Sequence, residues 1–229
     1  LSLNLLFMSL HMPIYLYFMI FCFTIVLTLF LRIYAVKKNV IDIPNERSSH
    51  TLPTPRGGGV SIVISFLIAI GLCTYLDFIN YILGTMMFIS GALIAIVGFI
   101  DDHGHIDAKW RLLTHLAASF LVVYCLGGLP PLNLFGIDID FGMVGVGLAT
   151  IAIIWILNLF NFMDGIDGIA SVEAICATFF AGFFLDVLSP DSSLVILHWL
   201  LSATVCGFLV LNFPPAKIFM GDAGSGFLG

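Results

Sequence analysis

Seven long apolar runs, separated by short polar segments, are the feature that most restricts how this chain can fold. They cover approximately residues 14–31, 60–76, 82–100, 112–126, 143–159, 169–188 and 194–211. A helix needs about 20 apolar residues to cross a bilayer, whereas a strand of a membrane β-barrel is short and alternates apolar with polar residues. Because the runs are continuous, they predict an all-α, polytopic transmembrane helical bundle of about seven spans. We find no repeat and no separate soluble unit, so residues 1–229 are expected to form one integral membrane domain.

The composition agrees with a chain that lies mostly in lipid. Of the 229 residues, 60% are hydrophobic and only 10% are charged, whereas soluble domains have about 25% charged residues. Disordered segments are poor in aliphatic and aromatic residues, which are abundant here. A net charge of −6 with only eight Lys and Arg residues provides no basic face for phosphates, so we expect no nucleic-acid partner.

Basic and acidic residues sort to opposite sides of the predicted bundle. If connections alternate between the two faces, those after the first, third, fifth and seventh runs hold all eight Lys and Arg residues. The other connections hold acidic residues and no basic one. Because Lys and Arg accumulate in cytoplasmic loops, the basic side is predicted to be cytoplasmic.

Carboxylates gather on this same side, at the ends of separate runs: Asp101, Asp102, Asp164, Asp167 and Asp222. Their convergence would be strongly repulsive without a cation, and oxygen ligands suit Mg²⁺ or, as an alternative, Mn²⁺. A transporter would place ionisable groups near the middle of its spans. The pattern therefore favours an enzyme at the cytoplasmic surface. A cation- or proton-coupled transporter that uses the same carboxylates is the alternative.

Other polar segments near these carboxylates suggest a ligand. The glycines after Arg56 and those around Asp222 would let backbone N–H groups approach an anion, while Asp222 holds a metal ion on it. A diphosphate bridged by Mg²⁺ would use these parts together; the alternative for each segment is a tight helix-packing turn. Lys109 and Arg111 either bind a lipid phosphate or contact anionic headgroups. Asn and Asp recur every third residue at Asn158, Asn161, Asp164 and Asp167, which adds a polar stripe to the end of an apolar run.

Taken together, these motifs resemble the polyprenyl-phosphate N-acetylhexosamine-1-phosphate transferases, which form glycosyltransferase family 4. The resemblance extends from about Asp42 to Gly229. It rests on the stretches PTPRGGG (53–59), GFIDD (98–102), NLFNFMDGIDGIA (158–170) and NFPPAKIFMGDAGSGFLG (212–229). PTPRGGG and DDHGHIDAKWRLLTH look more like the O-antigen-initiating branch than the peptidoglycan branch. Family members carry further spans and a later cytoplasmic loop with a His-rich motif, so we expect this chain to lack C-terminal spans.

The resemblance implies transfer of a sugar-1-phosphate from a UDP-N-acetylhexosamine to undecaprenyl phosphate, with release of UMP, at the cytoplasmic face of a bacterial inner membrane. Membrane lipids are further expected partners, and a homodimer is left open. The implied roles are metal binding by Asn161 and Asp222, catalysis on the lipid phosphate by Asp101 and Asp102, and nucleotide binding by Asp164 and Asp167. Arg56 and Lys109 are predicted to be additional substrate-binding residues.

Overall fold

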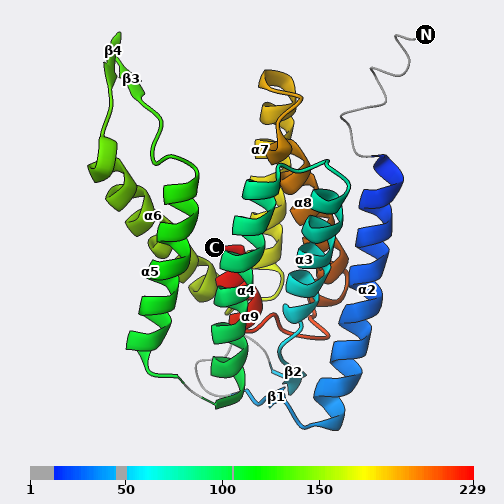
Figure 1. Cartoon of the computed structure of the whole chain (residues 1–229). Helices are drawn as coiled ribbons and strands as arrows, with labels where there is room; N and C mark the ends of the chain where they lie inside the picture. The colour runs from blue at the N-terminus through cyan, green and yellow to red at the C-terminus, as the bar shows by residue number, and fades with distance from the viewer. Residues whose placement is uncertain (1–12, 45–50, 105) are drawn as a thin grey trace, which may run out of the picture.

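The computed structural model confirms the all-α, multi-helix architecture (Figure 1). It describes residues 13–44, 51–104 and 106–229. Each predicted apolar run forms a helix: α2 (Ile14–Lys37), α3 (Val60–Tyr75), α4 (Tyr81–Gly104), α5 (Ala108–Cys125), α6 (Gly142–Met163), α7 (Ile169–Leu188) and α8 (Ser193–Asn212). A further short helix, α9 (Asp222–Leu228), follows the last run.

Five helices within the described ranges are both long and apolar enough to cross a membrane, by length and composition: α2, α4, α6, α7 and α8. Helix α3 is apolar but has only 16 residues. Helix α5 has 18 residues and includes Lys109, Arg111 and His115, which make it more polar than the others. Both shorter helices still lie beside the long ones (Figure 1).

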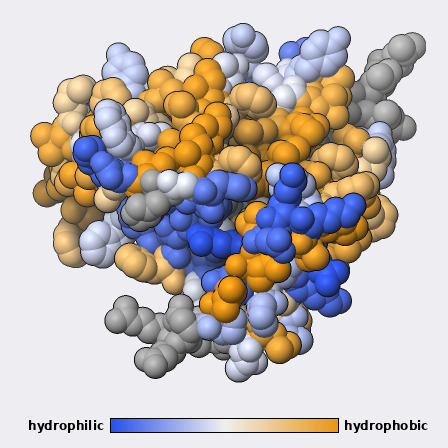
Figure 2. Space-filling model, turned by 90° about the horizontal axis from the view of Figure 1, so that it is seen from below, coloured by the Kyte–Doolittle hydropathy of each residue, from blue (hydrophilic) through white to orange (hydrophobic). Residues whose placement is uncertain are grey.

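Successive helices run in opposite directions, so the connections alternate between two ends (Figure 1). At one end β1 (Ile41–Asp42) pairs antiparallel with β2 (Thr54–Pro55), and at the other end β3 (Leu132–Leu134) pairs with β4 (Ile137–Ile139). The described Lys and Arg residues all lie toward the β1–β2 end, as the alternation predicts; Arg47 is outside the described residues. We call this the basic end. Figure 2 shows hydrophilic side chains gathered there, within a largely apolar surface.

Two clusters of buried apolar side chains form the interior. One joins α3 and α8 through Phe66, Ile70 and Leu200. The other lies nearer the basic end, where α3 and α8 supply Ile62, Val205 and Phe208, and the segment before α9 inserts Ile218 and Met220. The second cluster fixes the start of α9 inside the bundle, in contact with α3, α4 and α6.

Glycines allow α9 to approach its neighbours closely. A Cβ atom on Gly98 of α4 would lie 2.6 Å from the carbonyl oxygen of Asp222 and 2.7 Å from the Cα of Ala223. A Cβ on Gly59 would lie 2.5 Å from the Cα of Gly224. These neighbours are backbone atoms, which move less easily than the end of a side chain. The start of α9 can therefore pack this closely only because Gly59 and Gly98 have no side chain.

Replacing Gly98 with Ala is expected to lower stability, because the added methyl group would push α9 away from α4. Overpacking of this kind typically costs about 1–3 kcal/mol. Gly71 of α3 provides the matched control, because a Cβ there meets nothing within 4 Å. Gly71→Ala should be neutral or stabilising, by up to about 1 kcal/mol. Thermal unfolding in detergent, followed by circular dichroism, measures both; equal melting temperatures for the two variants would contradict the close contact.

Candidate functional site

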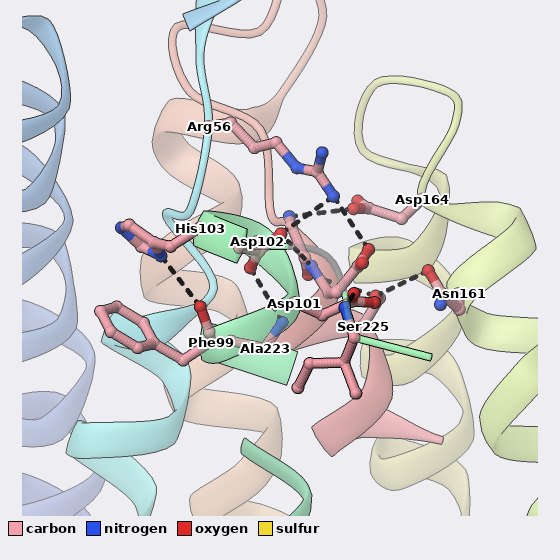
Figure 3. Close-up of polar contacts among 12 residues, drawn as sticks. Arg56, Phe99, Asp101, Asp102, His103, Asn161, Asp164, Ala223 and Ser225 are labelled. Atoms are coloured by element: carbon pink, nitrogen blue, oxygen red, sulfur yellow. Dashed lines mark hydrogen bonds and ion pairs between the residues drawn. The ribbon is translucent and has the colours of Figure 1, made fainter. Parts of the chain in front are cut away.

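Segments that are far apart in the sequence meet at the basic end (Figure 3). The segment before α3 pairs with the segment before α9: Phe219 N–H donates to the carbonyl of Pro55, Gly58 N–H to that of Phe219, and Gly59 N–H to that of Met220, each at 2.8 Å. This pairing places the side chains before α3 beside the first residue of α9. The end of α4 and the turn after α6 complete the site.

Gly58 and Gly59, after Arg56, do not present their N–H groups to a ligand, contrary to one of the two sequence interpretations. Both donate to backbone carbonyls, as expected for the tight packing turn that was the alternative. The N–H groups around Asp222 do bind anions, but these anions are carboxylates of the chain itself. The Gly221 N–H donates to Asp164 Oδ2 at 3.0 Å.

Asp102 binds the N-terminus of α9. Its side chain is only 2% exposed. Oδ1 accepts the N–H of Asp222 at 2.9 Å, and Oδ2 accepts the N–H of Ala223 at 3.1 Å. The first N–H groups of a helix have no partner within the helix and carry partial positive charge, so a carboxylate there is favourable. Asp102 therefore joins the end of α4 to the start of α9.

Arg56 lies among several of these acidic groups. One of its terminal nitrogens is 2.9 Å from Asp102 Oδ1 and 3.0 Å from Asp222 Oδ1. Burial opposes the charge of Arg56, but Asp102, Asp222, Asp42 and Asp164 together raise its pKa above the ordinary value. The guanidinium therefore stays charged and neutralises part of the acidic site.

Arg56 does not compensate all of the negative charge. Burial raises the pKa of Asp164 to about 7, although the Gly221 N–H and Arg56 act in the opposite direction, and Asp222 and Asp102 raise it further. The pKa of Asp222 is also raised, first by burial and then by Asp102, with Arg56 lowering it in part. Without another cation, these carboxylates resist ionisation.

The raised pKa of Asp164 should make the stability of the protein depend on pH. Its folded pKa of about 7 exceeds the unfolded value of 3.8, so the folded state binds the proton more tightly. Stability should therefore fall as the pH rises from about 4 to 7. Asp164→Asn should remove this loss and stabilise the protein by on the order of 4 kcal/mol at pH 8, with little effect near pH 4. Melting temperatures at several pH values in EDTA measure this; a difference that stays constant with pH would contradict the raised pKa.

A cavity of about 240 Å³ opens beside this network, between α4, α5, α6 and α9. Its polar lining is Asp101 from α4, Arg111 and His115 from α5, Asn158 and Asn161 from α6, and Asp222 from α9. Three residues predicted from the sequence, Asp101, Asn161 and Asp222, therefore share one cavity. Arg56, Asp102 and Asp164 lie in the adjoining network, where Figure 3 shows the side chain of Arg56 pointing toward Asp102.

The cavity residues are held in place by further hydrogen bonds. Asp101 Oδ1 accepts the N–H of Ile106 at 2.7 Å, and Oδ2 pairs with a guanidinium N–H of Arg111. The hydroxyl of Ser225 donates to Asn161 Oδ1 at 3.3 Å. The carboxyl groups of Asp101 and Asp222 also contact each other. One wall of the cavity is thus built from fixed oxygen atoms.

None of the four predicted substrate-binding residues lines the cavity: Arg56 and Asp164 lie in the adjoining network, and Asp167 and Lys109 make separate contacts. Asp167 Oδ2 accepts the N–H of Ala216 at 2.9 Å and so anchors the segment that leads to α9. Lys109 is 67% exposed and pairs with Asp107 at 3.1 Å. The nearby basic residue that lines the cavity is Arg111.

From the sequence, Arg111 and Lys109 are both candidates for phosphate binding, whereas His115 is not among the predicted site residues. A signal for it was present: Arg111 and His115 are four residues apart, which places them on the same face of a helix. Asn158 is the first residue of the polar series at 158, 161, 164 and 167. The sequence did not predict that it lines the cavity.

The residues present fit a hard divalent cation. Asp101 and Asp222 supply carboxylate oxygens and Asn161 an amide oxygen, and all three line the cavity. Within the described ranges, no three Asp, Glu, His or Cys side chains are grouped so that they could hold a metal ion alone. Mg²⁺ typically takes one or two carboxylates and completes its shell with water and phosphate oxygens. This donor set therefore suits an ion shared with a phosphate-bearing substrate.

Comparison with known proteins gives consistent matches. Residues 84–229 match the family model described as Glycosyl transferase family 4. The chain is 30% identical over 217 residues to a probable undecaprenyl-phosphate N-acetylglucosaminyl 1-phosphate transferase of Bacillus subtilis, covering 90% of this chain and 57% of the relative. It is 31% identical over 187 residues to a phospho-N-acetylmuramoyl-pentapeptide-transferase of Wolbachia pipientis, covering 75% and 56%.

Another relative is a decaprenyl-phosphate N-acetylglucosaminephosphotransferase of Mycolicibacterium smegmatis, 30% identical over 219 residues, with 86% of this chain and 53% of the relative covered. The chain thus spans about half the length of the curated relatives it matches. Together with the five long apolar helices, these matches identify a multi-pass membrane protein.

Proposed function

We propose, because the chain belongs to glycosyl transferase family 4, that it transfers N-acetylhexosamine-1-phosphate from a UDP-sugar to undecaprenyl phosphate. An oxygen of the lipid phosphate would attack the phosphorus that carries the sugar. The bond from this phosphorus to the oxygen shared with UMP would break, and UMP would leave. We place this reaction at the first membrane step of surface polysaccharide synthesis of the O-antigen type.

One observation carries this proposal: a single cavity at the basic end is lined by both acidic and basic side chains. Asp222 and Asn161 line it together with Arg111 of α5. Transfer between two phosphate compounds requires that two anions meet, so charge neutralisation and positioning account for most of the catalysis. A cavity with both kinds of side chain is suited to holding a metal-bound diphosphate and a second phosphate.

In this proposal Asp222 and Asn161 hold Mg²⁺, for which Mn²⁺ is an alternative, and Asp101, in the same cavity, acts on the lipid phosphate. When bound, the ion would neutralise the diphosphate and the charge that develops on leaving UMP. Asp102 would act by fixing the backbone of Asp222 rather than by contacting the reacting atoms, because both of its oxygens already accept N–H groups of α9.

Four residues outside the cavity lining would contribute to substrate binding, directly or indirectly. Arg56 would bind donor phosphate next to Asp222, since part of its side chain is exposed. Asp164 would lie near the nucleotide. Lys109, on the exposed surface, would face anionic headgroups at the membrane, and Asp167 would act through the segment it anchors.

The charge distribution supports a location on the cytoplasmic face of a bacterial inner membrane. The described Lys and Arg residues lie at the end that holds the cavity, and basic residues favour the cytoplasmic side. UDP-sugars are cytoplasmic compounds, so the site would open toward its donor.

A transfer assay tests the proposal. The purified protein in proteoliposomes should release UMP from UDP-N-acetylglucosamine or another UDP-N-acetylhexosamine only when undecaprenyl phosphate and Mg²⁺ are both present, and EDTA should stop the release. UMP release without the lipid would indicate hydrolysis and overturn the proposal. The absence of release with every UDP-sugar, together with ion flux across the vesicles, would favour the transporter instead.

A further inference from the structure

The connection between α5 and α6 forms a short β-hairpin whose two faces differ in polarity. Its strands, β3 and β4, form three cross-strand pairs: Leu132 with Ile139, Asn133 with Asp138, and Leu134 with Ile137. Side chains alternate between the faces of a strand, and directly paired residues share a face, so the four aliphatic side chains lie together. On the other face, Asn133 Nδ2 donates to Asp138 Oδ1 at 2.7 Å. The hairpin is therefore amphipathic.

The apolar face of this hairpin is not covered by the rest of the described chain. Leu134 and Ile137 are 47% and 66% exposed, and Phe135, between them at the tip, is fully exposed. Figure 1 shows the hairpin projecting beyond the ends of α5 and α6, away from the interior of the bundle. Packing within the described chain therefore does not account for a cluster of apolar side chains here.

The tip of the hairpin carries a residue that the turn itself disfavours. Phe135 and Gly136 are the two central residues, and both have positive φ, 53° and 84°, as in a type I′ turn. Gly, Asn and Asp adopt such angles readily, whereas a bulky side chain is strained there. A strained and fully exposed Phe does not stabilise the turn, so its contact lies outside the hairpin.

The surroundings of the hairpin favour lipid as that contact. Exposed apolar side chains continue from the hairpin onto the helices that it joins, at Tyr124 of α5 and at Met143 and Val144 of α6. Helix α7 is long and apolar enough to cross a membrane, and it reaches the level of the hairpin (Figure 1), where its last residue, Leu188, is exposed. The hairpin therefore continues the lipid-facing surface of the bundle.

Size, charge and backbone hydrogen bonding narrow the choice further. The hairpin spans only residues 132–139, whereas a stable protein interface takes about 20–30 residues from each partner. Residues 127–142 include Asp138 and Asp140 but no Lys or Arg, so attraction to anionic headgroups does not contribute. In the described chain this sheet has two strands, and both outer edges keep unpaired backbone groups that the hydrocarbon core could not satisfy. The headgroup region, where water is present, satisfies them.

We propose that the β3–β4 hairpin is an anchor in the membrane interface, at the end of the bundle opposite the basic end. Phe135 and the apolar face insert among the lipid headgroups, while Asn133 and Asp138 face water. The anchor goes beyond the proposed function and does not depend on it. It holds the connection between α5 and α6, the helices that supply Arg111 and Asn161 to the cavity.

Spin labels along the hairpin test the anchor in the full chain, in nanodiscs of phosphatidylcholine and phosphatidylglycerol that hold one copy. The five native cysteines, all free, are replaced by Ala, and single cysteines are introduced at positions 132–139 for labelling. Electron paramagnetic resonance then measures collisions with oxygen, which concentrates in lipid, and with a nickel chelate, which stays in water. The oxygen-to-nickel ratio should alternate with a period of two and be about threefold or more higher for Leu134→Cys and Ile137→Cys than for Asn133→Cys and Asp138→Cys.

The matched control is Asp191→Cys, in the exposed turn between α7 and α8 at the same end of the bundle. Its label should show the low ratio of a site in water. Equally low ratios at all hairpin positions would overturn the proposal, and this is the result expected if the apolar face binds a second copy, which these discs exclude. Labels on the apolar face that are shielded from both reagents would indicate a contact with protein and would also overturn it.

A second measurement keeps the native cysteines, in case their replacement prevents folding. Phe135→Trp adds a fluorophore at the tip, and lipids brominated close to the headgroup should quench the added fluorescence. Asp191→Trp is the control and should be quenched little. Equal quenching of the two variants would contradict the anchor. None of these measurements requires transfer activity, so the anchor and the proposed function stand or fail separately.

Discussion

Asp222→Asn should lose about three orders of magnitude or more in UMP release, because the metal ion and its effect on the diphosphate contribute several kcal/mol to such reactions. The fold should survive, since the backbone N–H of Asp222, which binds Asp102, is unchanged. The melting temperature in EDTA should rise, because burial and Asp102 both oppose ionisation of the native carboxylate. Activity and stability are therefore expected to change in opposite directions.

The measurements are the rate of UMP release as a function of Mg²⁺ concentration and the binding of Mn²⁺ followed by electron paramagnetic resonance. Asp191→Asn is the matched control, because Asp191 is an exposed residue at the opposite end of the bundle. It should leave both measurements unchanged. Wild-type Mn²⁺ binding by Asp222→Asn would show that this carboxylate does not hold the ion.

The helices and the end at which the polar residues gather were predictable from local sequence. A continuous apolar run has to satisfy its backbone hydrogen bonds internally when it lies in lipid, so helices follow directly. Connections that alternate between faces then bring Asp101, Asp164 and Asp222 to one end, although long stretches of sequence separate them. Within the described residues, length and polarity set two of the helices apart from the five that are long and apolar enough to cross a membrane: α3 is short, and α5 carries Lys109, Arg111 and His115.

Local sequence does not determine which polar groups bind each other across the site. Gly58 and Gly59 appeared free to bind an anion because their partners, Phe219 and Met220, lie about 160 residues later in the chain. Arg111 lines the cavity, whereas Lys109, two residues earlier, is exposed, because residues two apart point to different sides of a helix. The exact end of α6 likewise decides that Asp164 reaches Gly221 whereas Asp167 reaches Ala216.

Asp102→Ala should reduce stability more than any other single carboxylate substitution at the site. It would leave two N–H groups of α9 unpaired and would remove one partner of Arg56, a loss of about 2–5 kcal/mol for a buried charged group. Asp102→Asn should lie between this variant and the wild type, because its amide keeps only one acceptor oxygen. Asp107→Ala is the control: Asp107 pairs with Lys109 and both side chains are about two-thirds exposed, so its loss should cost at most about 1 kcal/mol.

The affinity for Mn²⁺ shows whether Asp102 positions the start of α9 or acts as a catalytic base. If Asp102 positions the start of α9, its loss should weaken Mn²⁺ binding and slow UMP release by about two orders of magnitude, because Asp222 would move relative to Asp101 and Asn161. If Asp102 only accepted a proton as a catalytic base, its loss would slow UMP release but would leave the Mn²⁺ affinity and the melting temperature at wild-type values. That second pattern would contradict the positioning role. The first would explain why two adjacent aspartates act differently: Asp101 lines the cavity, whereas Asp102 holds the helix that brings Asp222 to it.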